Sequence, residues 1–436
     1  MKHLDKTILL SIFALFIFSS WSLNLQPSQK QEKEREIQEK AIAINIEVPV
    51  RVYDGERFVE NLSIEDFILY EEGIEQKIDA VYLIKQRAIK RKESVEEEGI
   101  ISEEDLEKKF APQESRHFFL VFELLDYIPQ INEVTDYLFQ NVIQPEDTLQ
   151  VMTPIKTYRF RPEAFKKKTK EEMAAALLNI VKKDMGIGNF EYRNLVDDMK
   201  RIVRAIVNFF GAPEANIMDD FGTSIYTQDR EDDLNRYITA YEIDLNRLER
   251  IRGIEQKRLI DFGESLKEIE GQKIVFLLYQ REYIPQVDQK IILQYSNLSQ
   301  SDPAMYMALE NITGFYTRGT SIDSDKVKQA YADPAISAHF MFLTKSAEMT
   351  PGITMQESSS DVFEAFKSLA DATGGSVDSS SSAKHLFEQA VEASENYYLL
   401  YYTPKNYVAD GKFKKIEVKV KSKKYRVTHR EGYIAD

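Results

Sequence analysis

HFFLVF, at residues 117–122, is a continuous apolar run bounded by polar segments. Such runs are typical of strands that a sheet buries on both faces, as in parallel sheets covered by helices. Similar runs follow in TLQVM (148–152), KIVFLL (273–278) and ISAHFMFL (336–343). Together they predict the core strands of one sheet.

Segments with helical spacing of apolar residues lie between and after these runs. They cover 131–142, 170–181, 191–210, 231–269, 362–370 and 384–393, and the strand-like YYLLYY follows at 397–402. The sequence Thr373-Gly374-Gly375 is a helix C-cap signal. Strands that alternate with helices predict an α/β fold with a doubly wound, mostly parallel sheet.

The two ends of the chain alternate apolar and polar residues instead, the pattern of strands with one buried face. Residues 41–86 predict a small antiparallel β module, in which Ser63 caps one short helical turn. Residues 411–434 predict a β-hairpin that completes this module, so we expect the two ends of the chain to meet. Residues 87–116 are rich in Lys and Glu and predict a charged linker.

Composition limits the possible functions. The chain has 436 residues and a net charge of −15, which disfavours a nucleic-acid partner. It has no cysteine, which excludes a thiol nucleophile, a cysteine zinc site and a disulfide framework. The five histidines are scattered singly, and no hydrolase, P-loop or dinucleotide-binding motif occurs.

The N-terminus has the pattern of an export signal. Lys2, His3 and Lys6 precede the apolar run 8–18, and Ser20 and Ser22 stand where a signal peptidase requires small residues. Residues 1–22 therefore predict a cleaved signal peptide and a secreted, periplasmic or envelope location. An uncleaved anchor is the alternative, and it is the only route to the membrane that we expect from this sequence.

Several short motifs resemble bacterial proteins related to the von Willebrand factor type A (VWFA) domain. At the N-terminal end they are Val48-Pro49-Val50, Asp54-Gly55, Glu65-Asp66-Phe67, Tyr70-Glu71-Glu72-Gly73 and Gln76-Lys77-Ile78. At the C-terminal end they are Thr373-Gly374-Gly375, Tyr397–Pro404, Asp410–Phe413 and Arg430-Glu431-Gly432-Tyr433. The resemblance implies a VWFA-like α/β domain over residues 117–403, with a helical insertion at about 185–270.

The family resemblance also implies a metal-ion-dependent adhesion site, in which hard oxygen ligands hold Mg²⁺. The sequence departs from that pattern. Glu123 stands where the first Asp is usual, both serines are missing, and Tyr279-Gln280-Arg281 replaces the expected Asp turn and adds a positive charge. The remaining candidate ligands are Glu123, Asp126 and Thr223. The alternative is that Glu123 and Asp126 cap the next helix or are solvated.

We therefore expect a binding protein of the cell envelope that recognises another protein without catalysis and without metal. A membrane-tethered assembly or structural factor is one alternative, and an unrecognised hydrolase is the other. His339 lies inside an apolar strand, where a core role is the simpler interpretation than a catalytic base. For Tyr397, Tyr398, Tyr401 and Tyr402 we weigh an exposed contact surface against packing at a sheet edge with hydroxyls in water.

Overall fold

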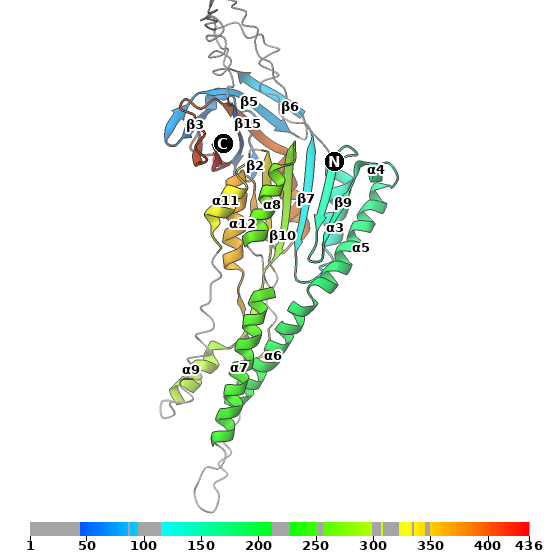
Figure 1. Cartoon of the computed structure of the whole chain (residues 1–436), viewed down its shortest axis with the longest axis vertical. Helices are drawn as coiled ribbons and strands as arrows, with labels where there is room; N and C mark the ends of the chain where they lie inside the picture. The colour runs from blue at the N-terminus through cyan, green and yellow to red at the C-terminus, as the bar shows by residue number, and fades with distance from the viewer. Residues whose placement is uncertain are drawn as a thin grey trace, which may run out of the picture. The chain divides into compact units, whose positions relative to one another are not determined.

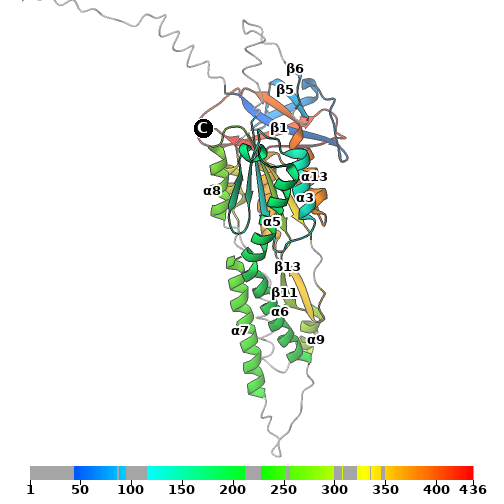
Figure 2. The same ribbon diagram turned by 90° about the vertical axis from the view of Figure 1, so that its right-hand side faces the viewer.

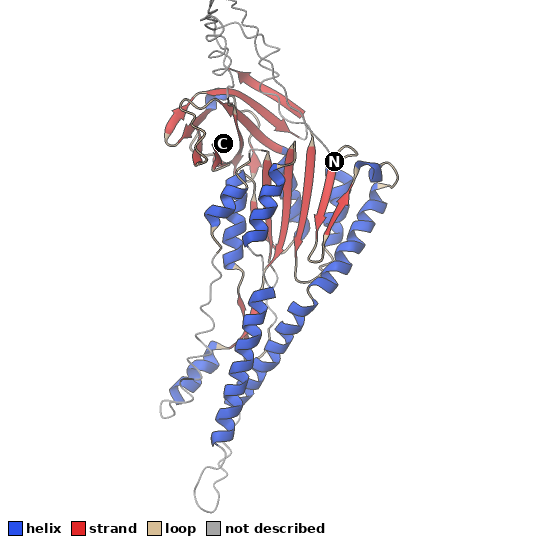
Figure 3. Cartoon of the chain, viewed as in Figure 1, coloured by secondary structure: helices blue, strands red, loops and turns tan. Residues whose placement is uncertain are grey.

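The computed structural model describes residues 44–85, 88–94, 115–211, 227–251, 256–298, 307, 322–333, 335–344 and 349–435. Asn45–Asp436 belong to one compact unit. The predicted signal peptide and Thr223 lie outside the described residues. The described part is a mixed α/β structure with a mostly parallel sheet and separate antiparallel sheets (Figures 1 and 3).

The parallel sheet contains the four predicted apolar runs. Its strands are β7 (Arg116–Glu123), β8 (Thr148–Met152), β9 (Thr157–Phe160), β10 (Gln272–Gln280), β12 (Ile336–Leu343) and β14 (Val377–Ser380). Their order across the sheet is β14-β12-β10-β7-β8-β9, and only the edge strand β9 is antiparallel to its neighbour. Read along the chain this is the order 3-2-1-4-5-6, which is common among doubly wound sheets.

Helices cover both faces of this sheet, which explains why its central strands are apolar on both sides. One face packs against α3 (Ile131–Tyr137), the π-helical turn η2 (Leu138–Val142), α4 (Pro162–Phe165), α5 (Lys170–Gly188) and α13 (Ala383–Glu395). The other packs against α8 (Gln256–Lys267), α11 (Ser324–Ala330) and α12 (Ser360–Thr373). Figure 2 shows α8 on one side of the sheet and α3 and α13 on the other. Among the described helices, none combines the length and apolar character needed to cross a membrane.

A second group of elements has a hydrophobic core of its own. It contains α6 (Phe190–Gly211), α7 (Thr227–Ile251), β11 (Tyr283–Val287), α9 (Gln289–Leu298) and β13 (Ile353–Glu357). We call these elements the helical insertion. The single long helix expected over 231–269 is wrong, because α7 ends at Ile251 and α8 begins at Gln256. α8 packs on the sheet through Leu259 and Leu266, so it lies outside the insertion, which also recruits residues beyond 270.

The β module joins the two ends of the chain, as predicted. One antiparallel sheet has the order β17-β1-β15-β5-β6 with β2 on β1, and the other has the order β18-β16-β3-β4. The N-terminal elements are β1 (Ile46–Asp54), β2 (Arg57–Phe58), η1 (Ile64–Asp66), β3 (Phe67–Glu71), β4 (Ile74–Gln76), β5 (Ile78–Lys85) and β6 (Ala88–Ser94). The C-terminal strands are β15 (Asn396–Tyr402), β16 (Phe413–Val420), β17 (Arg426–His429) and β18 (Gly432–Ile434).

Three expectations about this module are wrong in detail. YYLLYY was expected in the α/β sheet, but β15 pairs antiparallel with β1 and β5. The 411–434 hairpin does not form as such, because β17 pairs with β1 and β16 pairs with β3 and β18. The expected linker 87–116 begins with a strand, since β6 pairs with β5; its residues 95–114 lie outside the described part.

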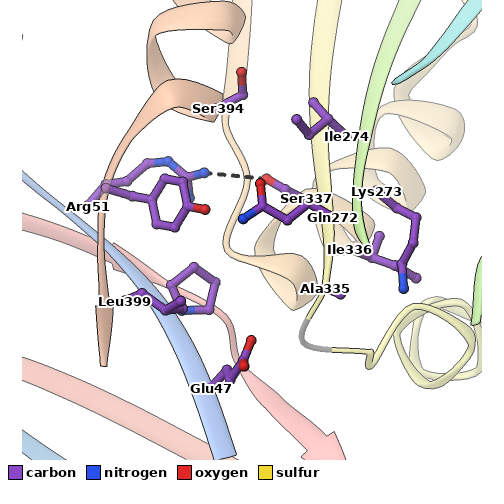
Figure 4. Close-up of a pocket in the computed structure, with 12 residues that line it drawn as sticks. Glu47, Arg51, Gln272, Lys273, Ile274, Ala335, Ile336, Ser337, Ser394 and Leu399 are labelled. Atoms are coloured by element: carbon purple, nitrogen blue, oxygen red, sulfur yellow. Dashed lines mark hydrogen bonds between the residues drawn. The ribbon is translucent and has the colours of Figure 1, made fainter. Parts of the chain in front are cut away.

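Two buried arginines connect the β module to the amino edge of the parallel sheet. Arg51 and Arg430 are each 1% exposed. Arg51 donates to the carbonyl oxygens of Gly374 and Ala393 and, over 3.3 Å, to the Ser337 hydroxyl (Figure 4). Gly374 is the C-cap of α12 and Ala393 lies in the last turn of α13. The guanidinium therefore satisfies carbonyls that two helix ends leave without intrahelical donors.

Arg430 makes the equivalent connection on a neighbouring helix. Its Nη2 donates to the Ala332 carbonyl over 2.6 Å, just past the end of α11, and its Nη1 donates to the Glu47 carbonyl over 3.2 Å. Helices of a parallel α/β sheet run opposite to the strands, so their negative C-terminal ends gather at the amino edge. The guanidinium groups of Arg51 and Arg430 lie beside this partial negative charge. The cavity left beside Arg51 is only about 40 Å³, which is little more than one water volume.

We predict that Arg51→Met destabilises the protein by about 2–4 kcal/mol, because two buried helix-end carbonyls lose their charged donor. Urea denaturation monitored by circular dichroism measures this change. The control is Arg57→Met at an exposed position of β2, which we expect to change the free energy of unfolding by less than about 0.5 kcal/mol. Equal effects of the two substitutions would contradict the role assigned to Arg51.

Candidate functional site

In open α/β sheets, ligands bind outside the carboxyl ends of the strands, at the point where the strand order reverses. In this sheet the point lies between β7 and β10, because the chain continues outward from each of them in opposite directions. β7 ends at Glu123 and β10 ends at Gln280. The segments that follow these two residues therefore form the candidate site.

A cavity of about 100 Å³ lies at this edge. Two strands and the helical insertion contribute its walls, so the fold brings together residues that are far apart in the sequence. Its lining includes Glu123, Leu124, Asn189, Glu191, Tyr192, Ile251, Tyr279 and Glu282. We refer to it as the edge cavity.

Side-chain amides fix the loop that follows β7. The Gln280 Oε1 atom accepts hydrogen bonds from the backbone N–H groups of Leu125 (3.0 Å) and Asp126 (3.1 Å). The Asn189 Nδ2 atom donates to the Leu124 carbonyl over 2.6 Å. Neither Gln280 nor Asn189 was predicted from the sequence to belong to the site. A polar residue directly after a buried strand was the available signal for Gln280, whereas Asn189 could be found only from the structure.

The structure describes two of the three candidate metal ligands, Glu123 and Asp126. Glu123 lines the edge cavity, but Asp126 lies 3.9 Å from the Arg193 guanidinium, measured from Oδ1 to Nη1. Within the described ranges no group of three or more acidic or histidine side chains could hold a metal ion. Thr223, the third candidate, lies outside those ranges. The alternative that Glu123 and Asp126 cap the next helix is wrong, because Gln130 occupies the N-cap of α3.

Arg281 was expected to add positive charge to the site, but the cavity lining does not include it. Its Nε lies 3.8 Å from the Glu357 carboxylate, and its guanidinium carbon lies 5.2 Å from the centre of the Phe342 ring. Glu282, one residue later, is 3% exposed and accepts a hydrogen bond from the Tyr279 hydroxyl. The lining of the edge cavity therefore includes the carboxylates of Glu123, Glu191 and Glu282.

Glu123 has a perturbed ionisation in this cavity. Burial raises the pKa of the Glu123 carboxyl to about 7, and the nearby Glu282 carboxylate adds to this rise while Arg258 opposes it. Among the described residues, none forms a hydrogen bond or an ion pair with the Glu123 side chain. A carboxylate that is costly to ionise and unmatched by the fold is typical of a functional site.

A second group of polar side chains lies near the amino edge of the sheet. The His339 Nε2 atom is 2.9 Å from the Ser337 hydroxyl, and its Nδ1 atom is 2.9 Å from the Ser376 hydroxyl. His339 is fully buried, and desolvation, with Arg51 nearby, lowers its pKa well below the usual value. The adjoining cavity of about 40 Å³ has no room for a substrate. We assign these contacts to the connection made by Arg51.

The tyrosines of β15 serve the β module. Tyr398 and Tyr402 are fully buried in a central strand, so neither of the two expectations for them holds. The Tyr398 hydroxyl donates to the Val59 carbonyl over 2.9 Å, and the Tyr402 hydroxyl donates to the Glu71 carboxylate over 2.5 Å. These hydroxyls stabilise the module internally and are not available to a partner.

We predict that Glu123→Gln raises the thermal stability at pH 8 by a few degrees and has little effect at pH 5. In the folded protein the pKa of the Glu123 carboxyl is raised from 4.5 to about 7. The protein therefore loses stability as the pH rises between these values, because the folded state must ionise this buried group. Glutamine has no such charge. Differential scanning calorimetry from pH 5 to pH 8 measures the difference; a pH-independent difference would show that Glu123 is not the perturbed group.

Comparisons with known proteins add nothing to this geometry. No family model matches the chain, no curated protein matches it, and no solved structure matches it. The fold is therefore described by its own strand order and contacts. Any function has to be argued from the residues of the candidate site.

Proposed function

We propose that the protein is an exported, non-catalytic binding protein whose α/β region is VWFA-like and whose partner is another protein. The order of the parallel sheet, with its single antiparallel edge strand, supports the VWFA-like assignment together with the motifs at both chain ends. Several of these motifs, among them Val48-Pro49-Val50 and Tyr70-Glu71, lie in strands of the β module, where segments from the two ends pair. The charged and apolar N-terminus supports export.

One observation favours protein binding at the edge cavity. The segments that line it carry exposed large apolar side chains: Phe190 is 61% exposed, Ile187 is 57% exposed, and Ile251, which lines the cavity, is 37% exposed. Phe190 and Ile187 flank the cavity residues Gly188 and Asn189 in the chain. Exposed apolar side chains beside a polar cavity are typical of protein-binding surfaces.

Binding by this route is metal-independent. The Arg193 guanidinium lies beside the Asp126 carboxylate, and Gln280, the last residue of β10, occupies the position where the metal site of the family has an acidic residue. The side-chain amides of Gln280 and Asn189 make hydrogen bonds to the loop that follows β7. A partner would therefore meet side chains directly and not through a bound cation.

We predict that Phe190→Ser abolishes capture of the partner when the purified protein is used as bait on an envelope extract of its native source. Removal of an exposed aromatic anchor commonly costs 2 kcal/mol or more of binding free energy. The control is Ile74→Ser on β4, which is also exposed (53%) but belongs to the β module. Undiminished capture by Phe190→Ser, or none by the wild-type protein, would contradict the proposal.

Export is tested separately. We predict that mass spectrometry of the protein isolated from its native source finds a new N-terminus after Ser22. An intact N-terminus would favour the membrane-tethered alternative instead. This measurement concerns residues outside the described part and leaves the assignment of the edge cavity unaffected.

A further inference from the structure

We propose that the edge cavity binds the ammonium group of a lysine side chain presented by the partner protein. This inference rests on the proposed protein-binding function and names the chemistry of its partner. It reverses the usual arrangement in the family that the sequence resembles, where a bound cation receives an acidic residue. Here the protein supplies the acidic residue.

Glu123 lines the cavity, and no described side chain or backbone N–H donates a hydrogen bond to its carboxylate. The charged groups that act on it are Arg258 and Glu282, one of each sign. Three other groups at the same edge do have partners: Asp126 with Arg193, Glu191 with Arg247 at 2.7 Å, and Glu282 with Tyr279. Glu123 is thus the acceptor that the fold leaves for a ligand, and a donor that carries a positive charge satisfies it best.

The size of the edge cavity suits the end of a side chain better than a small metabolite. About 100 Å³ corresponds to roughly three water volumes, whereas cavities for small metabolites commonly have 300 Å³ or more. This space suits the end of one side chain. An ammonium is a compact charge with three donors, while a guanidinium is a wider planar group.

The lining of the edge cavity combines apolar side chains with carboxylates. Leu124, Tyr192 and Ile251 line the cavity beside the carboxylates. A lysine side chain combines an apolar stem with a charged end, and such stems bury against apolar surface. Aromatic rings also attract an ammonium through their negative faces. The cavity therefore offers complementary surface to both parts of a lysine.

Ligand-observed NMR tests the inference on the purified protein at pH 8. The probe is Nα-acetyl-lysine N-methylamide, and its neutral match is the norleucine analogue. We expect saturation transfer to the lysine probe only, with at least a tenfold loss of affinity in Glu123→Gln. Glu75→Gln, at an exposed position of β4 in the β module, should change the affinity by less than twofold.

Each other outcome overturns the inference. Equal signals from the two probes would show apolar binding alone, and unchanged binding in Glu123→Gln would place the ammonium elsewhere. Tighter binding of the matching arginine probe would replace lysine by arginine, and competition by MgCl₂ at equal ionic strength would indicate a metal site. Capture of the partner equally by wild-type protein and Glu123→Gln would leave the proposed function standing while removing lysine recognition.

Discussion

The burial of Arg51 and Arg430 is the constraint on which the rest of the structure depends. A buried cation without partners is very costly, so each guanidinium has to be surrounded by acceptors. The acceptors are carbonyls at the ends of α11, α12 and α13, which gather at the amino edge of the parallel sheet. Because the arginines come from β1 and from the end of β17, the two chain ends must close on each other before these helix ends are satisfied. The β module thus acts as a shared C-cap for three helices.

This arrangement also determines which edge of the sheet is available for function. The amino edge is occupied by the β module, whose cavity beside Arg51 is only about 40 Å³. The carboxyl edge carries the larger edge cavity, and the helical insertion supplies part of its walls. His339, buried near Arg51, therefore has a structural role, whereas Glu123, at the other edge, is a candidate functional residue. His339 belongs to a satisfied hydrogen-bond network, whereas Glu123 is left without a donor among the described residues.

Local patterns were sufficient to predict most strands and helices, because burial on two faces, burial on one face and helix caps each leave a distinct signature. Pairing between distant segments was not predictable in the same way. YYLLYY has the composition of a central strand in either sheet, and only the partners β1 and β5 decide its place. Arg51 stands on the polar face of an alternating strand, which is ordinarily solvated. For the site, the position at the end of β7 identified Glu123. Tyr192 comes from the helical insertion and Asn189 from the C-cap of α5, and local sequence does not encode how these segments reach the site.

Hydrogen exchange followed by mass spectrometry in increasing urea tests most directly whether the arginines make one cooperative unit of the β module and the parallel sheet. The account predicts that peptides covering β1 and β15 lose their protection at the same urea concentration as peptides covering β10 and β12. Loss of protection in β1 and β15 at a clearly lower urea concentration, with β10 and β12 still protected, would contradict it.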